Sequence, residues 1–175
     1  EALINKLSSE NLIDLKRVYA VGYSNGGMMS YALACYKSNL IAAIGSVSGY
    51  MLQSTSSVSE SECTPSHSIP LIKLHGTTDY YDGEGVYNSV DSVLNFWVSF
   101  NNTNTDPIIN NIDDNGTAIT SYKYENGDNN VSVEHYKIIG GEHVWFNNDF
   151  NGKNTGQLIW DFVSKYDIDR SEERR

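Results

Sequence analysis

Val18-Tyr19-Ala20-Val21-Gly22-Tyr23-Ser24-Asn25-Gly26-Gly27-Met28-Met29 is the stretch that decides the fold of this 175-residue chain. It opens with a short apolar, β-rich run that ends at glycine, which predicts a buried strand. The chain then turns through Gly-x-Ser-x-Gly and continues into residues that favour a helix. We interpret Gly22, Gly26 and Gly27 as the small residues that let strand and helix approach around a strained turn at Ser24. The helix N-terminus then directs its free N–H groups toward an oxyanion formed beside the serine hydroxyl.

The composition restricts the partners of the chain. Its length is that of one domain, and its ordinary apolar content is enough for a core. With 22 acidic and 12 basic residues the formal net charge is −10, which argues against nucleic acid and against an anionic membrane surface. No apolar run is long enough to span a bilayer, and no signal peptide is visible.

The two cysteines, Cys35 and Cys63, form no Cys-x-x-Cys pair, so the sequence does not support a zinc or redox motif. Cys35 comes late in the predicted helix, and Cys63 lies in a polar, Ser-rich loop over 50–68. A disulfide between them would join the loop to the helix and would indicate an oxidising compartment. The alternative is two free thiols in a cytosolic enzyme.

The remaining helices and strands are predicted from hydrophobic periodicity and from the glycine and asparagine residues that mark turns between them. Helices are predicted over 1–15, 86–100 and 158–163, and buried strands over 41–49 and 70–76. The Asn-rich stretch 101–115 is expected to be irregular, and 119–124 and 131–139 are expected to form a hairpin or two neighbouring strands. We expect one domain over 1–168, and a charged, disordered tail over 169–175.

Ser24, Asp79 and His143 each follow the end of a predicted strand, where open α/β sheets carry their functional groups. Their order along the chain is that of the nucleophile, acid and base of the α/β-hydrolase fold. His143 would take the proton of Ser24, Asp79 would orient the imidazole, and the N–H of Asn25 would bind the oxyanion. The less favoured candidates are Asp82 and Asp91 for the acid, and His67, His75 and His135 for the base.

Three stretches carry a resemblance to a known family. They are 17–28 with 33–35, then Cys63-Thr64-Pro65 ahead of His75-Gly76-Thr77-Thr78-Asp79, and finally Gly140-Gly141-Glu142-His143-Val144-Trp145. With them the chain resembles the serine esterases grouped with poly(3-hydroxybutyrate) depolymerases and with feruloyl and acetylxylan esterases, carbohydrate esterase family 1. The resemblance covers most of the chain up to the last predicted helix.

The resemblance implies an α/β-hydrolase fold with a mostly parallel sheet, a Ser24–Asp79–His143 triad and a Cys35–Cys63 disulfide. It implies a secreted or periplasmic esterase without a cofactor or metal, acting on short acyl, acetyl, feruloyl or polyhydroxyalkanoate esters. Tyr23 and Trp145 are expected to line the substrate site, although a core position is an equal alternative for Trp145.

The family fold begins well upstream of Glu1, with early strands and a loop that supplies the second oxyanion N–H. We therefore expect an N-terminally truncated domain whose exposed sheet edge pairs with a second copy or with an upstream segment. The rival interpretations are a catalytically impaired remnant that serves binding or structure, and a serine peptidase of the prolyl-oligopeptidase type. A calcium loop over 147–158 is disfavoured, because Leu158 stands where a bidentate glutamate is needed.

Overall fold

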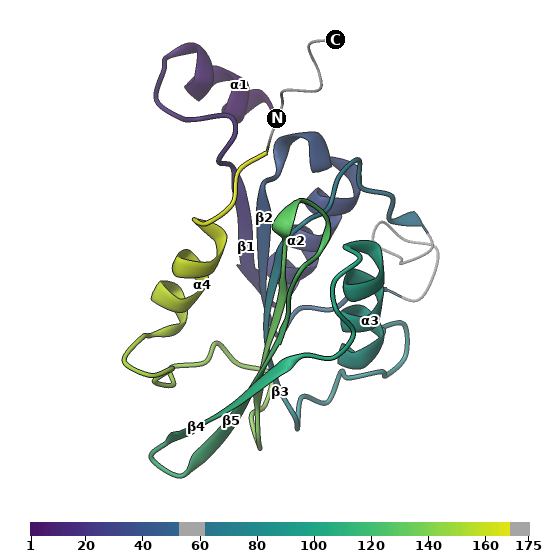
Figure 1. Cartoon of the computed structure of the whole chain (residues 1–175), viewed down its shortest axis with the longest axis vertical. Helices are drawn as coiled ribbons and strands as arrows, with labels where there is room; N and C mark the ends of the chain where they lie inside the picture. The colour runs from purple at the N-terminus through teal and green to yellow at the C-terminus, as the bar shows by residue number, and fades with distance from the viewer. Residues whose placement is uncertain (53–61, 169–175) are drawn as a thin grey trace.

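The computed structural model describes residues 1–52 and 62–168. Within these residues one six-stranded sheet has the order β1-β2-β3-β6-β5-β4, and its elements are drawn in Figure 1. The strands are β1 (Tyr19–Tyr23), β2 (Ala43–Val47), β3 (Leu71–Gly76), β4 (Ile108–Asp114), β5 (Thr117–Tyr124) and β6 (Val133–Ile138). β1, β2, β3 and β6 are parallel, and β5 and β4 continue the sheet antiparallel. This mostly parallel sheet confirms the predicted α/β-hydrolase fold class.

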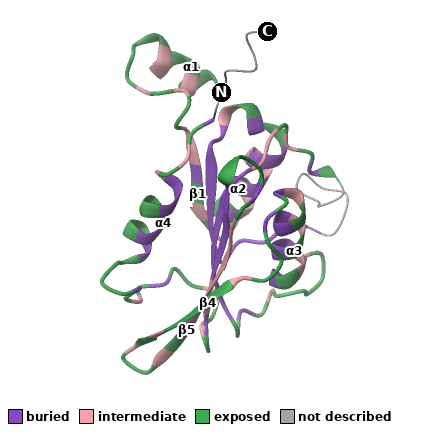
Figure 2. Ribbon diagram, viewed as in Figure 1, coloured by how far each residue is buried: buried purple, intermediate pink, exposed green. Residues whose placement is uncertain are grey.

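Helices cover both faces of the sheet, as the buried parallel strands require. The helices α2 (Asn25–Tyr36) and α3 (Val90–Phe100) pack on one face, and α4 (Thr155–Val163) packs on the other, as Figure 1 shows. Because side chains alternate along a strand, Leu71 packs in the core between the sheet and the helices α2 and α3, and Ile72 packs in the core between the sheet and α4. Figure 2 shows the buried residues concentrated in the strands between these layers.

Helix ends depart from the periodicity because capping, not hydrophobic spacing, determines where helices start and stop. The helix α1 (Ala2–Ser9) is shorter than the predicted 1–15 and buries none of its side chains. Ser89 caps α3 by accepting a hydrogen bond from the Ser92 N–H, so this helix begins at Val90 and not at residue 86. At α4 a capping box of Asn154 and Gln157 starts the helix three residues before the predicted position.

The prediction of an irregular stretch over 101–115 was wrong, because Ile108–Asp114 forms β4. This strand pairs with β5 in a hairpin closed by Asn115-Gly116, whose φ angles of 51° and 91° suit a tight two-residue turn. Most of this strand is exposed, and its asparagine and aspartate residues interrupt the alternation of apolar and polar residues by which a strand is predicted from sequence. The neighbouring strands predicted over 119–124 and 131–139 are confirmed as the antiparallel pair β5 and β6.

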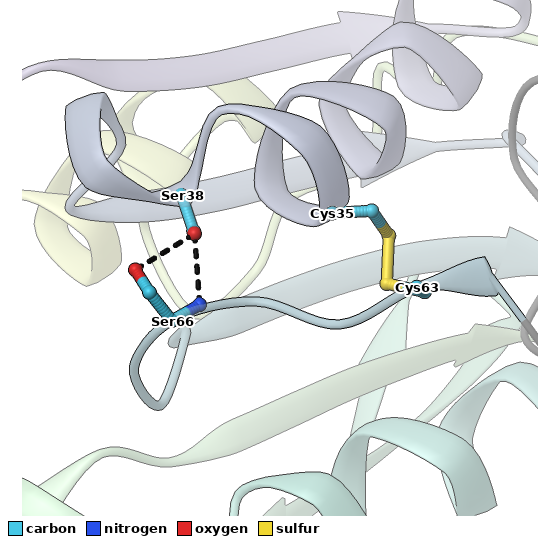
Figure 3. The surroundings of a disulfide bond; sticks show 4 residues. All are labelled: Cys35, Ser38, Cys63 and Ser66. Atoms are coloured by element: carbon cyan, nitrogen blue, oxygen red, sulfur yellow. Dashed lines mark hydrogen bonds between the residues drawn. A yellow bond between two sulfur atoms is a disulfide. The ribbon is translucent and has the colours of Figure 1, made fainter.

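A disulfide joins Cys35, near the end of α2, to Cys63, and their Cα atoms lie 4.6 Å apart (Figure 3). Beside it, the N–H of Ser66 donates to Ser38 Oγ at 2.9 Å, which attaches the same segment to the short 3₁₀ helix η1 (Ser38–Leu40). The pairing confirms the disulfide and excludes the free thiols. The middle of the predicted loop, 53–61, and the charged tail, 169–175, lie outside the described residues. In the part of the chain that is described, no helix has the length and apolar character that crossing a membrane requires.

Candidate active site

Ser24 lies at the sharp turn between β1 and α2, with φ 51° and ψ −117°. A positive φ is strained for a residue with a side chain, and it persists here because the surroundings hold it: the Ser24 N–H donates to Val47 O at 2.9 Å. A Cβ on Gly22 would lie 2.2 Å from the carbonyl carbon of Gly26, so the turn needs glycine at that position.

The three glycines of the turn differ in what they do. A Cβ on Gly27 would lie 2.6 Å from Ser46 Oγ and 3.1 Å from the Cα of Gly49, so Gly27 also makes room for the sheet. A Cβ on Gly26 would meet nothing within 4 Å. The interpretation that all three residues must be small is therefore wrong for Gly26. Gly22 must be small because the backbone of Gly26 lies against it.

The sheet brings together three side chains that are far apart in the sequence. Ser24 follows β1, Asp79 follows β3 and His143 follows β6, all at the carboxyl ends of parallel strands. His143 Nε2 lies 2.8 Å from Ser24 Oγ, and His143 Nδ1 lies 2.8 Å from Asp79 Oδ2. A carboxylate only accepts, so Nδ1 carries the proton, and Nε2 is free to accept the serine hydroxyl proton. The arrangement is a Ser–His–Asp hydrogen-bonded chain.

The loop after β6 must cross over β3 and β2 to bring His143 to Ser24, and its backbone is held at each step. Thr78 Oγ1 donates to Gly141 O at 2.8 Å, Tyr23 Oη to His143 O at 2.9 Å, and Ser48 Oγ to Val144 O at 3.1 Å. A Cβ on Gly76 would lie 2.1 Å from Gly141 O, so glycine at the end of β3 allows this close approach. These contacts fix the backbone on both sides of the imidazole.

Asp79 is an ionised carboxylate in a buried position, with 4% of its surface exposed. Burial alone would raise the pKa of Asp79, but hydrogen bonds from His75 and His143 and from the Tyr81 N–H outweigh it and hold this pKa well below its usual value. Asp79 therefore stays charged at neutral pH and can hold His143 in one tautomer.

Of the less favoured acids and bases, His75 contacts Asp79, and the other four lie outside the hydrogen-bonded chain of Ser24, His143 and Asp79. Asp82 accepts a hydrogen bond from the Val90 N–H at 2.7 Å, and Asp91 lies in the first turn of α3. His67 bridges the backbone carbonyls of Ser38 and Ser68, and His135 is buried in β6.

Of three further predicted residues, Asn25 and Tyr23 lie at the site, and Trp145 follows His143 by two positions in the same loop. Asn25 is the first residue of α2, where backbone N–H groups have no partner within the helix. The ring of Tyr23 lies 5.5 Å from that of His143. Trp145 is 39% exposed, so the alternative that it is a core aromatic does not hold.

Sequence patterns missed the groups that surround Asp79 and His143. The Tyr81 ring lies 5.1 Å from the His143 ring, and the backbone N–H of Tyr81 donates to Asp79 Oδ1 at 3.2 Å. His75 Nε2 lies 3.0 Å from Asp79 Oδ2 and 2.7 Å from Tyr50 Oη. The only sequence signal was the four-residue spacing of His75 and Asp79 across a strand end, which does not fix the side-chain directions.

Residues 1–105 match the sequence model of the Phospholipase/Carboxylesterase family. The chain is 30% identical over 169 residues to a bifunctional acetylxylan esterase/xylanase of Neocallimastix patriciarum, covering 95% of this chain and 23% of that protein. It is 27% identical over 177 residues to feruloyl esterase B of Piromyces equi, covering 94% of this chain and 30% of that protein. The chain thus spans less than a third of either relative. The match to more than half of its residues shows that it belongs to the phospholipase/carboxylesterase family of ester hydrolases.

Proposed function

We propose that this chain is a serine carboxylesterase whose nucleophile, base and acid are Ser24, His143 and Asp79. The observation that carries the proposal is the continuous chain of two 2.8 Å contacts, from Ser24 Oγ through the imidazole of His143 to Asp79 Oδ2. Family membership and the esterase names of the two relatives support the same chemistry.

In the proposed reaction Ser24 Oγ attacks the ester carbonyl carbon while its proton passes to His143 Nε2. The N–H of Asn25 at the start of α2 would stabilise the resulting oxyanion. The tetrahedral intermediate collapses, the leaving alkoxide takes the proton from His143, and the acyl group stays on Ser24. Water activated by the same imidazole then releases the acid and restores the hydroxyl.

The proposed substrate class is inferred from the names of the relatives and from the exposed aromatic residues that precede Ser24 and follow His143. Their names specify acetylxylan and feruloyl esters, so we propose short acyl, acetyl or feruloyl esters on plant polysaccharide, with polyhydroxyalkanoate esters as the alternative within the resembled family. Tyr23 and Trp145 are the proposed substrate contacts, since both are more than a third exposed. The disulfide supports a secreted or periplasmic location.

The test is hydrolysis of p-nitrophenyl acetate, p-nitrophenyl butyrate and methyl ferulate by the chain, by Ser24→Ala and by Ser30→Ala. Ser30 is the matched control because it lies in α2, the helix that follows Ser24, and its hydroxyl donates to the Gly26 carbonyl at 3.0 Å. We expect Ser24→Ala to lose about 10⁴- to 10⁶-fold in turnover, and to lose covalent labelling by a fluorophosphonate, while Ser30→Ala keeps both. Equal activity or equal labelling of Ser24→Ala would contradict the proposal.

A further inference from the structure

Two imidazoles share the carboxylate of Asp79. His143 Nδ1 approaches Oδ2 at 2.8 Å, and His75 Nε2 approaches the same oxygen at 3.0 Å. The side chains of His75 and Asp79 are 1% and 0% exposed, so bulk water cannot replace the contact between them. His75 is the last residue but one of β3, so a buried strand holds it in place. The proposed triad uses His143 and leaves the second imidazole without a role.

The contacts of His75 determine which of its nitrogens carries the proton. An ionised carboxylate only accepts, so Nε2 carries the proton that it donates to Asp79 Oδ2, and the Tyr50 hydroxyl oxygen, 2.7 Å from the same nitrogen, shares this N–H as a second acceptor. Burial, reinforced by the charge of Lys73, lowers the pKa of His75 to about 3, so the ring is neutral and Nδ1 is a bare acceptor. In the described part of the chain Nδ1 has no hydrogen-bond partner, and His75 lines a cavity of about 280 Å³. The opposite tautomer would leave two lone pairs facing each other at 3.0 Å.

From this geometry we propose that His75 is a positioning residue, which donates its Nε2–H to Asp79 and so fixes the carboxylate that orients His143. The inference rests on the proposed esterase function of the triad. A carboxylate bonded by one imidazole alone can turn about its side chain, whereas Asp79 is held at Oδ2 by His75 and at Oδ1 by the Tyr81 N–H. The second donor also takes up part of the negative charge that His143 would otherwise meet.

Other titratable groups surround His75, and a pH test must take them into account. They are Lys73 on β3, Tyr50 after β2, Asp79, Asp82 and His143 in loops, Asp91 on α3, Tyr122 and Tyr124 on β5, and His135 and Lys137 on β6. His135 offers a matched control. It is buried, lines the same cavity and has a pKa lowered by burial to about 3, but its Nδ1 bonds the Lys73 carbonyl and not Asp79.

The first test compares the pH dependence of kcat in His75→Leu, His75→Gln and His135→Leu, with p-nitrophenyl acetate as substrate. Loss of a hydrogen bond to a charged group corresponds to a fall of about 10- to 100-fold in His75→Leu. The acid limb of its pH–rate profile should also move to higher pH, because Asp79, without the second donor, presents more of its negative charge to the imidazole of His143. The amide of His75→Gln can donate to Asp79, so this variant should recover most of the rate.

His135→Leu should lose stability without moving the acid limb. If His75→Leu keeps both the rate and the limb of the wild type, or if it changes no more than His135→Leu, the positioning role is refuted.

A second measurement does not depend on turnover. In long-range ¹H–¹⁵N spectra of the labelled chain, His75 should show a protonated Nε2 and a bare Nδ1, and should stay neutral down to about pH 4. A protonated Nδ1, or titration near the usual pH of histidine, overturns the inference. Failure of the proposed function itself would appear separately, as wild-type activity that Ser24→Ala does not abolish.

Discussion

Replacing Gly22 by alanine is the sharpest perturbation of the turn at Ser24. The new Cβ would lie 2.2, 2.5 and 2.6 Å from the C, O and Cα atoms of Gly26, whereas ordinary contact begins near 3.4 Å. All three atoms are backbone, so no side chain can rotate away, and β1 and α2 must separate by about 1 Å. Overpacking a core costs about 1–3 kcal/mol, and we expect at least the upper end of that range for Gly22→Ala.

Gly26→Ala is the matched control, since its Cβ would point into open space and alanine favours a helix over glycine by up to about 1 kcal/mol. Thermal and urea unfolding of both variants are the assay. Gly22→Ala should lower Tm by roughly 6–12 °C, and a 1 Å displacement should reduce any esterase rate by about 10²-fold. Gly26→Ala should match or exceed the wild type in stability. A Gly22→Ala variant as stable as the wild type, or two equally destabilised variants, would refute this account of the turn.

Three further predictions follow from buried charge, the crosslink and the sheet edge. Burial lowers the pKa of Lys73 from 10.5 to about 7. Between pH 7 and pH 10.5 the unfolded chain therefore binds more protons than the folded chain. The free energy of unfolding should rise with pH in this range, by at most about 1.4 kcal/mol per pH unit. Urea unfolding at pH 7 and pH 9 should show this rise, and Lys73→Met should lack it. Replacing Cys35 and Cys63 by alanine should cost up to about 3.5 kcal/mol, from the 28-residue separation they span; unchanged unfolding would contradict a structural role. The edge strand β1 exposes 44% of Val21, so light scattering should detect self-association that Val21→Lys reduces, and a monomeric wild type at high concentration would exclude it.

The parts that the sequence predicted are those governed by neighbouring residues. The apolar run before Gly22, the turn at Ser24 and the helical residues after it interact within a dozen positions. The same holds for the strand ends ahead of Asp79 and His143, because a strand end is a local pattern of apolar residues and glycine. The α/β class and the three candidate catalytic residues therefore followed from the sequence, in agreement with the family resemblance.

The parts that it could not predict depend on which strands become neighbours. Ser24 and His143 meet across 119 residues, and His75 reaches Asp79 only because β3 ends where it does. Exposed strands such as β4 lack the apolar alternation that would mark them. The difference between Gly22 and Gly26 is likewise invisible in the motif, since it depends on the angle at which α2 leaves β1.

The sequence by itself thus determined the fold class, the turn at Ser24 and the order of the three candidate catalytic residues. Only the tertiary structure decided the strand order, the second imidazole on Asp79 and the hydrogen bonds that hold the loop of His143. The reason is physical: local patterns act through backbone sterics and periodic burial, whereas a hydrogen bond requires two groups within about 3 Å, and packing of the whole sheet sets that distance.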